Sequence, residues 1–133
     1  MAGRISVCGV ALLSVFLTSL CSSSVYASTP VSAFVKKTIS SHNIVVFSKS
    51  YCPYCKKAKA VFKELNQVPH VVELDQRDDG GDIQDVLNGM VGRRTVPQVF
   101  INGKHLGGSD DTVEAYESGK LAKLLGIAED DDL

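Results

Sequence analysis

The chain has 133 residues, of which 44% are apolar and 22% charged, and its formal net charge at pH 7 is −1. This length suits one folded domain, and the composition is that of an ordinary globular protein. The near-neutral charge excludes a strongly basic nucleic-acid binder, so no nucleic-acid partner is expected.

The first 27 residues differ from the rest of the chain. A single charge at Arg4 precedes an apolar run over residues 5–20, and Val25 and Ala27 stand three and one positions before a candidate cleavage point. This layout is typical of a secretory signal peptide cut after about residue 27. An uncleaved membrane anchor is the alternative, but the run is short for a span of about 20 apolar residues. We therefore expect a signal peptide over residues 1–27, a mature domain over 28–133, and a location in the secretory pathway or outside the cell.

Helical and strand patterns alternate along the first half of the mature chain. Apolar side chains share one helical face over residues 31–42, and the β-branched run 43–48 (NIVVFS) is typical of a buried strand. A helical pattern follows two cysteines at 52 and 55, and a second strand is predicted over 70–75. The turn RDDGGD (77–82) leads into a third helix, with Asp82 as its possible N-cap and Met90 on its inward face.

The second half predicts a hairpin followed by helices. Residues 95–108 (TVPQVFINGKHLGG) read as two strands joined at Asn102-Gly103. Ser109 is the expected cap of a helix whose inward face includes Tyr116, Gly119 ends that helix, and a final helix and a solvated acidic tail (129–133) follow. The order α-β-α-β-α-β-β-α-α predicts an α/β, thioredoxin-like fold: a four-stranded mixed sheet with helices on both faces and a core over about residues 31–127.

Two cysteines, Cys52 and Cys55, could form a metal site, a structural disulfide or a reactive pair. A structural zinc site needs four ligands, and the three histidines are scattered. A disulfide between residues three apart closes a very small loop and stabilises little. Reactive chemistry is favoured because Pro53 suits a first helical turn, which places Cys52 at the positive end of a helix beside Lys49. Both effects lower a thiol pKa, so Cys52 is the expected nucleophile and Cys55 the resolving thiol of a redox-active Cys52–Cys55 disulfide.

Four blocks of sequence, SKSYCPYC, IQDVL, GRRTVPQVFINGKHLGG and SDD, occur in this order. Together they resemble a glutaredoxin of the dithiol Cys-Pro-Tyr-Cys class, most closely its plant members, over about residues 31–127. The resemblance implies a glutathione-dependent thiol–disulfide oxidoreductase that reduces protein–glutathione mixed disulfides and low-molecular-weight or protein disulfides. NADPH and glutathione reductase would regenerate the glutathione.

The resemblance also implies which residues bind glutathione. Pro97 would be a cis proline facing the active cysteine, leaving the backbone of Val96 to pair with the tripeptide. The glycine carboxylate would meet Lys49 and Gln84. The γ-glutamyl carboxylate would accept hydrogen bonds from the N–H groups of Ser109 and Asp110, and the γ-glutamyl ammonium would pair with the Asp110 carboxylate. The remaining contacts implied by the family pattern are those of Tyr54, beside the disulfide, Thr95 and Gly108. Many relatives carry a cysteine where this chain has Ser109.

Two other functions remain as alternatives. Some glutaredoxins hold a [2Fe–2S] cluster between two chains, but glycine or serine typifies those members at the position of Pro53, so no cluster or other metal is expected here. A thioredoxin- or oxidase-like role without glutathione is disfavoured by Lys49, Gln84 and Asp110. The expected partners are glutathione, glutathionylated or disulfide-containing proteins and, indirectly, glutathione reductase, with the chain acting as a monomer. Most relatives work in the reducing cytosol, so a cytoplasmic location is the alternative to the more oxidising secretory pathway.

Overall fold

A computed structural model describes residue 3 and residues 29–127. The expected signal peptide (1–27), residue 3 apart, and the expected acidic tail (129–133) lie outside the described residues. The predicted order of elements is confirmed over this range: α1 (Pro30–Ser41), β1 (Ile44–Ser48), α2 (Pro53–Glu64), β2 (His70–Glu73), the 3-10 turn η1 (Leu74–Gln76), α3 (Gly80–Val91), β3 (Gln98–Ile101), β4 (Lys104–Gly107), α4 (Ser109–Glu117) and α5 (Lys120–Leu124).

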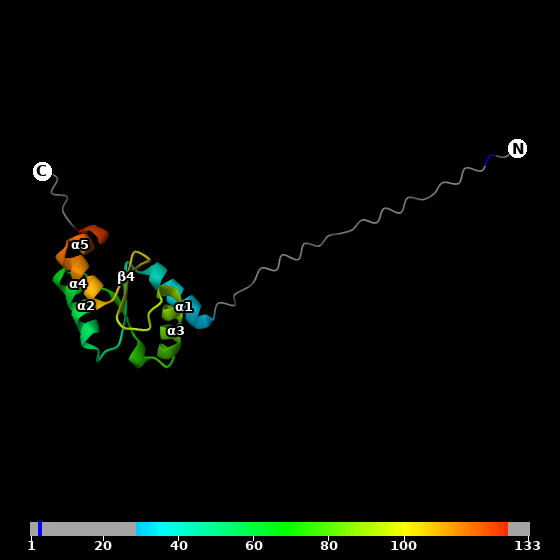
Figure 1. The fold of residues 1–133 in the computed structure, drawn as a ribbon, viewed down its shortest axis with the longest axis horizontal. Helices are drawn as coiled ribbons and strands as arrows, with labels where there is room; N and C mark the ends of the chain where they lie inside the picture. The colour runs from blue at the N-terminus through cyan, green and yellow to red at the C-terminus, as the bar shows by residue number, and fades with distance from the viewer. Residues whose placement is uncertain (1–2, 4–28, 128–133) are drawn as a thin grey trace.

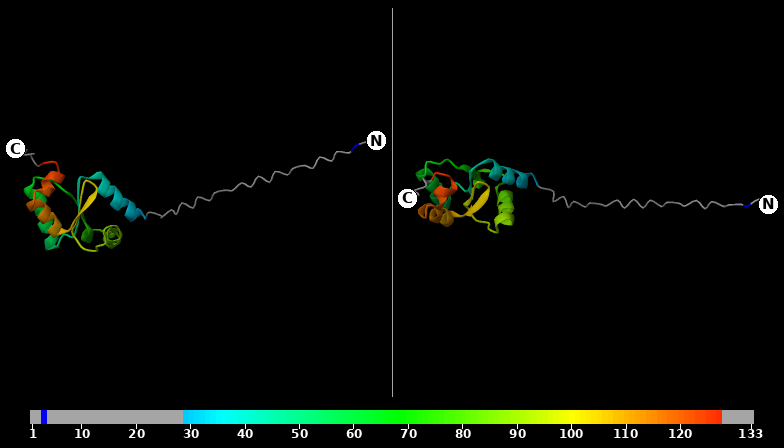
Figure 2. Two further views of the ribbon diagram at one scale, coloured as in Figure 1. Left: turned by 45° about the horizontal axis from the view of Figure 1, so that its top comes forward. Right: turned by 90° about the horizontal axis from the view of Figure 1, so that it is seen from above.

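The four strands form one mixed sheet in the order β2-β1-β3-β4. β1 pairs with β2 in parallel, whereas β1–β3 and β3–β4 are antiparallel. In Figures 1 and 2, α1 and α3 cover one face of this sheet and α2, α4 and α5 cover the other. The predicted thioredoxin-like α/β class is therefore confirmed.

The core consists of two apolar layers separated by the sheet. All five residues of β1 are buried because the strand is central and covered on both faces. Val45 and Phe47 pack with α1 and α3, whereas Ile44 and Val46 pack with α2, α4 and α5. This alternation follows from the two-residue period of a strand.

Several predicted boundaries were wrong. β2 ends at Glu73 rather than at residue 75, because the chain turns into η1 and buries Leu74 in the core. α3 begins at Gly80, so Asp79 is its N-cap residue and Asp82 lies within its first turn. β3 begins at Gln98 rather than at residue 95, since the preceding segment is irregular and contains a cis peptide bond.

The expected cap at the start of α4 was also wrong. Gly108 is the N-cap residue, and Ser109 is the first helical residue. Two side chains expected on inward helical faces are partly exposed: Met90 by 44% and Tyr116 by 37%. Gly119 separates α4 from α5 in a left-handed conformation, as predicted, with φ 79°. Over the range that the structure describes, no helix is long and apolar enough to span a membrane.

Candidate active site

Three segments that are distant in the sequence meet at one edge of the sheet. The loop after β1 carries the cysteines, the segment before β3 carries Val96 and Pro97, and the end of β4 leads into α4. Their meeting follows from the strand pairing, because Phe47 near the end of β1 lies opposite Gln98 at the start of β3, and Gly107 at the end of β4 lies opposite Val99.

Cys52 occupies the positive end of a helix, as predicted. It is the N-cap residue of α2, Pro53 is the first helical residue, and the Cys52 side chain makes no capping hydrogen bond. The first N–H groups of α2 therefore remain available to a negative charge on the sulfur. Both cysteines are free thiols, Cys52 partly exposed and Cys55 fully buried.

The two thiols have opposite acid–base properties. Burial disfavours ionisation of Cys52, but the Cys55 N–H and thiol, the Tyr54 N–H and the charge of Lys49 outweigh it and lower the Cys52 pKa below its usual value. Burial raises the pKa of Cys55, against the opposing effects of the Lys49 backbone and the Ser48 hydroxyl, while the neighbouring Cys52 raises it further. The exposed sulfur is thus the better nucleophile, and the buried sulfur keeps its proton beside it.

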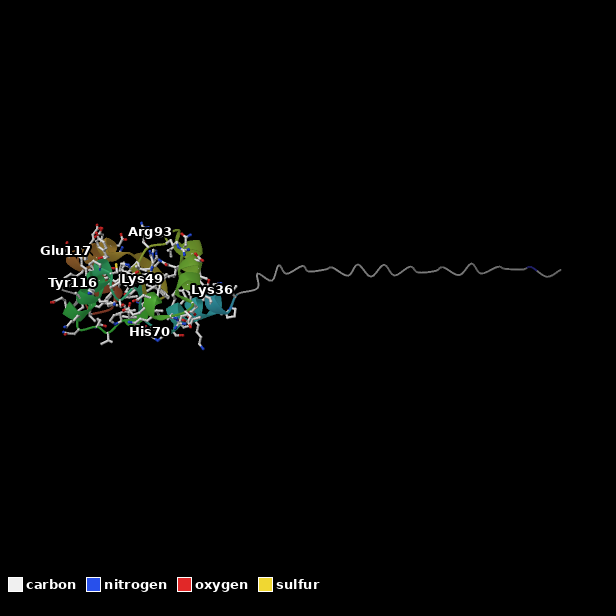
Figure 3. All side chains as sticks on the ribbon, turned by 90° about the horizontal axis from the view of Figure 1, so that it is seen from below. Lys36, Lys49, His70, Arg93, Tyr116 and Glu117 are labelled. Carbon is white, nitrogen blue, oxygen red and sulfur yellow. The ribbon has the colours of Figure 1, made fainter. Side chains whose placement is uncertain are left out.

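The loop before the cysteines is fixed from the neighbouring 3-10 turn. Asp75 in η1 accepts a hydrogen bond from the backbone N–H of Ser50 at 2.9 Å and another from its hydroxyl. The Cys52 N–H also donates to the carbonyl of Lys49 at 3.0 Å. These hydrogen bonds hold Lys49 and Cys52 on one short turn. In Figure 3, Lys49 and Arg93 lie between Tyr116 and Glu117 at one end of the domain and Lys36 at the other.

A groove of about 260 Å³ lies between the cysteine loop and the start of α4. The peptide bond between Val96 and Pro97 in its wall is cis, as the family pattern implied. The groove combines most of the predicted binding residues with two further charged ones; its lining is Tyr54, Arg93, Thr95, Val96, Pro97, Gly108, Ser109, Asp110 and Asp111. A larger hollow of about 530 Å³, between the end of α2 and β2, contains none of the predicted site residues.

The start of α4 forms the polar end of this groove. The Asp111 carboxylate accepts a hydrogen bond from the N–H of Gly108 at 2.9 Å, which is one half of a capping box. The Ser109 side chain is buried, and its hydroxyl has no hydrogen-bond partner among the described residues. Free N–H groups, the helix dipole and this hydroxyl together suit an anionic group.

Two predicted binding residues do not line the groove. Gln84 lies on α3, and its amide donates to the backbone carbonyl of Arg94 at 2.9 Å. Arg94 also pairs with Asp85, so this arginine is tied to α3. Lys49 instead lies close enough to Cys52 to lower the pKa of that thiol.

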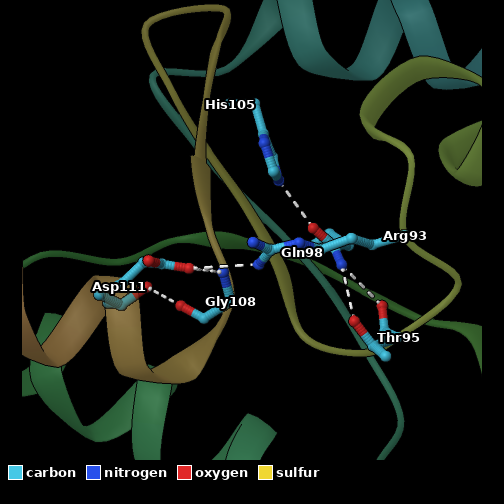
Figure 4. A network of polar contacts seen from close by, with 7 residues as sticks. Arg93, Thr95, Gln98, His105, Gly108 and Asp111 are labelled. Carbon is cyan, nitrogen blue, oxygen red and sulfur yellow. Dashed lines mark hydrogen bonds and ion pairs between the residues drawn. The ribbon is translucent and has the colours of Figure 1, made fainter.

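A polar network behind the groove was not predicted from the sequence. Gln98 is 1% exposed and bonds to Thr95 on one side and to His105 on the other (Figure 4). Asp111 was not predicted as a site residue either, although an acidic residue three positions after a helix cap is a recognisable pattern. Within residues 29–127, no group of three or more histidine, cysteine or acidic side chains is placed to hold a metal ion.

Comparisons with known proteins agree with this geometry. The sequence model of the Glutaredoxin family matches residues 44–106. Glutaredoxin-C4 of Arabidopsis thaliana is 69% identical over 123 residues, covering 92% of this chain and 91% of the relative. The chain belongs to the glutaredoxin family. Glutaredoxins are glutathione-dependent oxidoreductases, so this chain is an enzyme of that class.

Solved glutaredoxin structures have the same fold. The buckwheat glutaredoxin–glutathione complex matches with a TM-score of 0.69 at 44% identity, covering 71% of this chain and 86% of that one. The holo form of glutaredoxin C1 from Populus tremula x tremuloides matches with a TM-score of 0.72 at 40% identity, covering 76% of this chain and 100% of that one. The plant Cys-Pro-Tyr-Cys class predicted from the sequence agrees with these relatives.

Proposed function

We propose that this glutaredoxin reduces protein–glutathione mixed disulfides, and low-molecular-weight or protein disulfides, with glutathione as the electron donor. The observation that carries the proposal is the pairing of a partly exposed Cys52 of lowered pKa with a buried Cys55 of raised pKa. The groove beside them ends in a helix start suited to a carboxylate. The structure of the buckwheat relative with glutathione supports the choice of ligand.

The monothiol reaction needs only Cys52. Its thiolate attacks the glutathione sulfur of a protein–glutathione disulfide, and the protein thiolate leaves and takes up a proton. A second glutathione, as its thiolate, attacks the Cys52-bound glutathione sulfur. This step releases glutathione disulfide and restores the Cys52 thiolate, so the thiol of the incoming glutathione is oxidised as the protein sulfur is reduced, and the transferred glutathionyl sulfur keeps its oxidation state.

Protein disulfides use both cysteines. Cys52 attacks one substrate sulfur and forms a mixed disulfide, releasing the other substrate sulfur as a thiolate. Cys55 then attacks the Cys52 sulfur and gives up its proton, which the departing substrate sulfur takes up, so the substrate leaves fully reduced and the Cys52–Cys55 disulfide remains. Two glutathione molecules then reduce this disulfide and leave as glutathione disulfide. Because Cys55 is held one helical turn away, this second attack is intramolecular.

Glutathione is proposed to lie along the groove with its γ-glutamyl end at α4. The γ-glutamyl carboxylate would accept hydrogen bonds from the N–H groups of Ser109 and Asp110, and its ammonium would pair with the Asp110 carboxylate. The cysteinyl backbone would pair with the Val96 backbone as an added strand does. The glycine carboxylate would extend toward Lys49 and Gln84, whose amide must then be shared with the Arg94 carbonyl that it contacts now.

The test is glutathione-coupled reduction of a small glutathione mixed disulfide by residues 28–133. We expect Cys52→Ser to be inactive and Cys55→Ser to retain substantial activity, because the resolving thiol is needed only for protein disulfides. Wild-type activity that is unchanged when glutathione is omitted would overturn the proposal. NADPH with glutathione reductase serves as the proposed regenerating system in this assay, and its consumption of NADPH gives the signal.

Two further expectations accompany this function. The protein is expected to work as a monomer without metal or an iron–sulfur cluster, and the ultraviolet–visible spectrum and the sedimentation of anaerobically purified protein test both. A coloured, dimeric preparation would contradict them.

We also propose that residues 1–27 direct the chain into the secretory pathway, from which it acts in that pathway or outside the cell. The support is the single charge, apolar run and small residues of this segment. A full-length fluorescent fusion should enter the endoplasmic reticulum, and one lacking residues 1–27 should stay in the cytosol. Cytosolic fluorescence from both fusions would favour the cytoplasmic alternative.

A further inference from the structure

The wall of the groove is supported from behind by a buried amide. Gln98, the first residue of β3, is 1% exposed, and its side chain lies on the α1/α3 face of the sheet, as that of Phe100 does. Its Nε2 donates to the Thr95 carbonyl at 3.0 Å and to the Thr95 hydroxyl at 3.1 Å. Its Oε1 lies 2.7 Å from Nε2 of His105. Figure 4 shows the amide between these two residues.

The chemistry of these groups fixes every donor and acceptor in the chain. A backbone carbonyl can only accept, so the side of the Gln98 amide that faces Thr95 must be its NH₂ group. The amide oxygen therefore faces His105 and can only accept. It follows that Nε2 of His105 carries a hydrogen. The other ring nitrogen of His105, Nδ1, makes none of these hydrogen bonds. The arrangement of donors and acceptors is therefore the same whether or not Nδ1 is protonated.

This chain of hydrogen bonds sets the direction of one substrate-facing N–H group. The Thr95 carbonyl and the Val96 N–H belong to the same planar trans peptide unit, since the only cis bond among the described residues is the next one. Holding the carbonyl toward Gln98 thus turns the Val96 N–H to the opposite side. Thr95 and Val96 both line the groove, so the peptide unit separates the buried amide from the ligand.

We propose that Gln98, held in turn by His105, is the positioning residue that aims the Val96 N–H at the peptide backbone of glutathione. The inference rests on the proposed function, because it assumes that the groove takes this tripeptide. Neither residue touches the reacting sulfur atoms. Their removal should weaken ligand binding and raise the KM for glutathione, and it should leave kcat and the ionisation of Cys52 unchanged.

Three substitutions, one at Gln98 and two at His105, separate positioning from packing. Gln98→Leu removes the donor to Thr95 and should weaken binding about tenfold, the worth of one well-aimed hydrogen bond. His105→Phe keeps a ring against Phe100, whose centroid lies 5.1 Å away, but removes the N–H; it should weaken binding about threefold. His105→Gln restores a donor and should return binding toward wild type. His42→Phe, at a histidine outside the groove, is the matched control.

The measurement is calorimetric titration of residues 28–133 with S-methylglutathione, whose blocked thiol cannot react. KM and kcat from the coupled assay and the thiolate absorbance of Cys52 complete it. Thermal unfolding identifies any variant that does not fold; if Gln98→Leu fails, the two substitutions at the partly exposed His105 still decide.

The possible results distinguish this inference from the function on which it rests. If wild type binds S-methylglutathione and the Gln98 and His105 variants bind it equally well, the inference is wrong and the proposed function stands. A fall in kcat at unchanged KM also overturns it, since that result would place the network in the chemical step. If wild type itself binds no S-methylglutathione, both are wrong.

Discussion

Two adjacent glycines at the start of α3 should respond in opposite directions to alanine. A Cβ atom on Gly80 would lie 1.9 Å from the carbonyl oxygen of Leu74 and 2.8 Å from its carbonyl carbon. A Cβ atom on Gly81 would meet nothing within 4 Å. Neither glycine has a positive φ, so packing against η1 is the difference between them.

The magnitudes follow from that geometry. Alanine restricts the unfolded chain and favours the helix, so Gly81→Ala should raise the free energy of unfolding by about 0.4–1 kcal/mol. Gly80→Ala has the same gain, but it must push the Leu74 backbone away from 1.9 Å to the 3.0 Å that real Cβ contacts require. Such overpacking costs about 1–3 kcal/mol. The cost for Gly80→Ala should lie at the upper end of this range, because the new Cβ would clash with backbone atoms. Gly80→Ala should therefore lower the free energy of unfolding by about 2 kcal/mol in total.

Urea unfolding followed by far-ultraviolet circular dichroism measures both changes, because the chain has no tryptophan to report by fluorescence. In thermal unfolding followed by the same signal, the Tm of a domain of about 100 residues should fall by roughly 8–16 °C for Gly80→Ala and rise by roughly 2–8 °C for Gly81→Ala. Equal shifts in the two variants, or a stabilised Gly80→Ala, would show that Gly80 is not packed against Leu74 and would refute the reasoning.

Three other predictions concern the site. The Cys52 pKa is lowered, so its thiolate absorbance should appear at a lower pH than that of a free cysteine, and activity should fall as pH drops through that midpoint. Hydrogen bonds from Ser50 lower the Asp75 pKa, with the larger effect from the hydroxyl and the smaller from the N–H. The ionised carboxylate therefore stabilises the folded state above the Asp75 pKa of the unfolded chain, and this stabilisation is lost as the pH falls through the Asp75 pKa of the folded protein. Urea unfolding should show Asp75→Asn less stable than wild type at pH 7 and equal to it in strong acid. Gly107→Ala should raise the KM for glutathione, because at φ 136° its Cβ would lie 2.6 Å from Cβ of Asp111 in the groove; unchanged KM would contradict this.

The elements of the fold were predicted correctly from the sequence where a short stretch of residues is compatible with only one local structure. Residues 44–47 are all apolar, and a strand buried on both faces is the structure that accommodates such a run. Asn102-Gly103 specified a hairpin turn, with Asn102 at φ 51° and Gly103 at φ 81°. The reactive role of the cysteine pair was predictable because it depends on residues next to one another in the sequence: Pro53 marks the start of a helix and so places Cys52 at its N-terminus.

The errors occurred where tertiary contacts override local pattern. Leu74 continues the apolar alternation of β2, yet the chain leaves the sheet there so that Asp75 can reach Ser50. The space that a side chain at position 107 would fill is taken by the Asp111 carboxylate from α4, a contact that no local pattern reveals. The role of Gln98 depends on His105 lying on the neighbouring strand, which no local pattern reveals.

The two faces of the sheet contribute different parts of the reaction. Cys52, Cys55 and the start of α4 belong to the elements that cover one face, so substitutions there alter charge at the reacting sulfur or at the ligand. Gln98 and His105 lie on the other face and reach the groove only through the peptide unit between residues 95 and 96. A rigid amide plane transmits direction but carries no net charge to the thiol. Substitutions behind the sheet should therefore change glutathione affinity independently of thiol reactivity, which allows affinity and reactivity to vary separately within one fold.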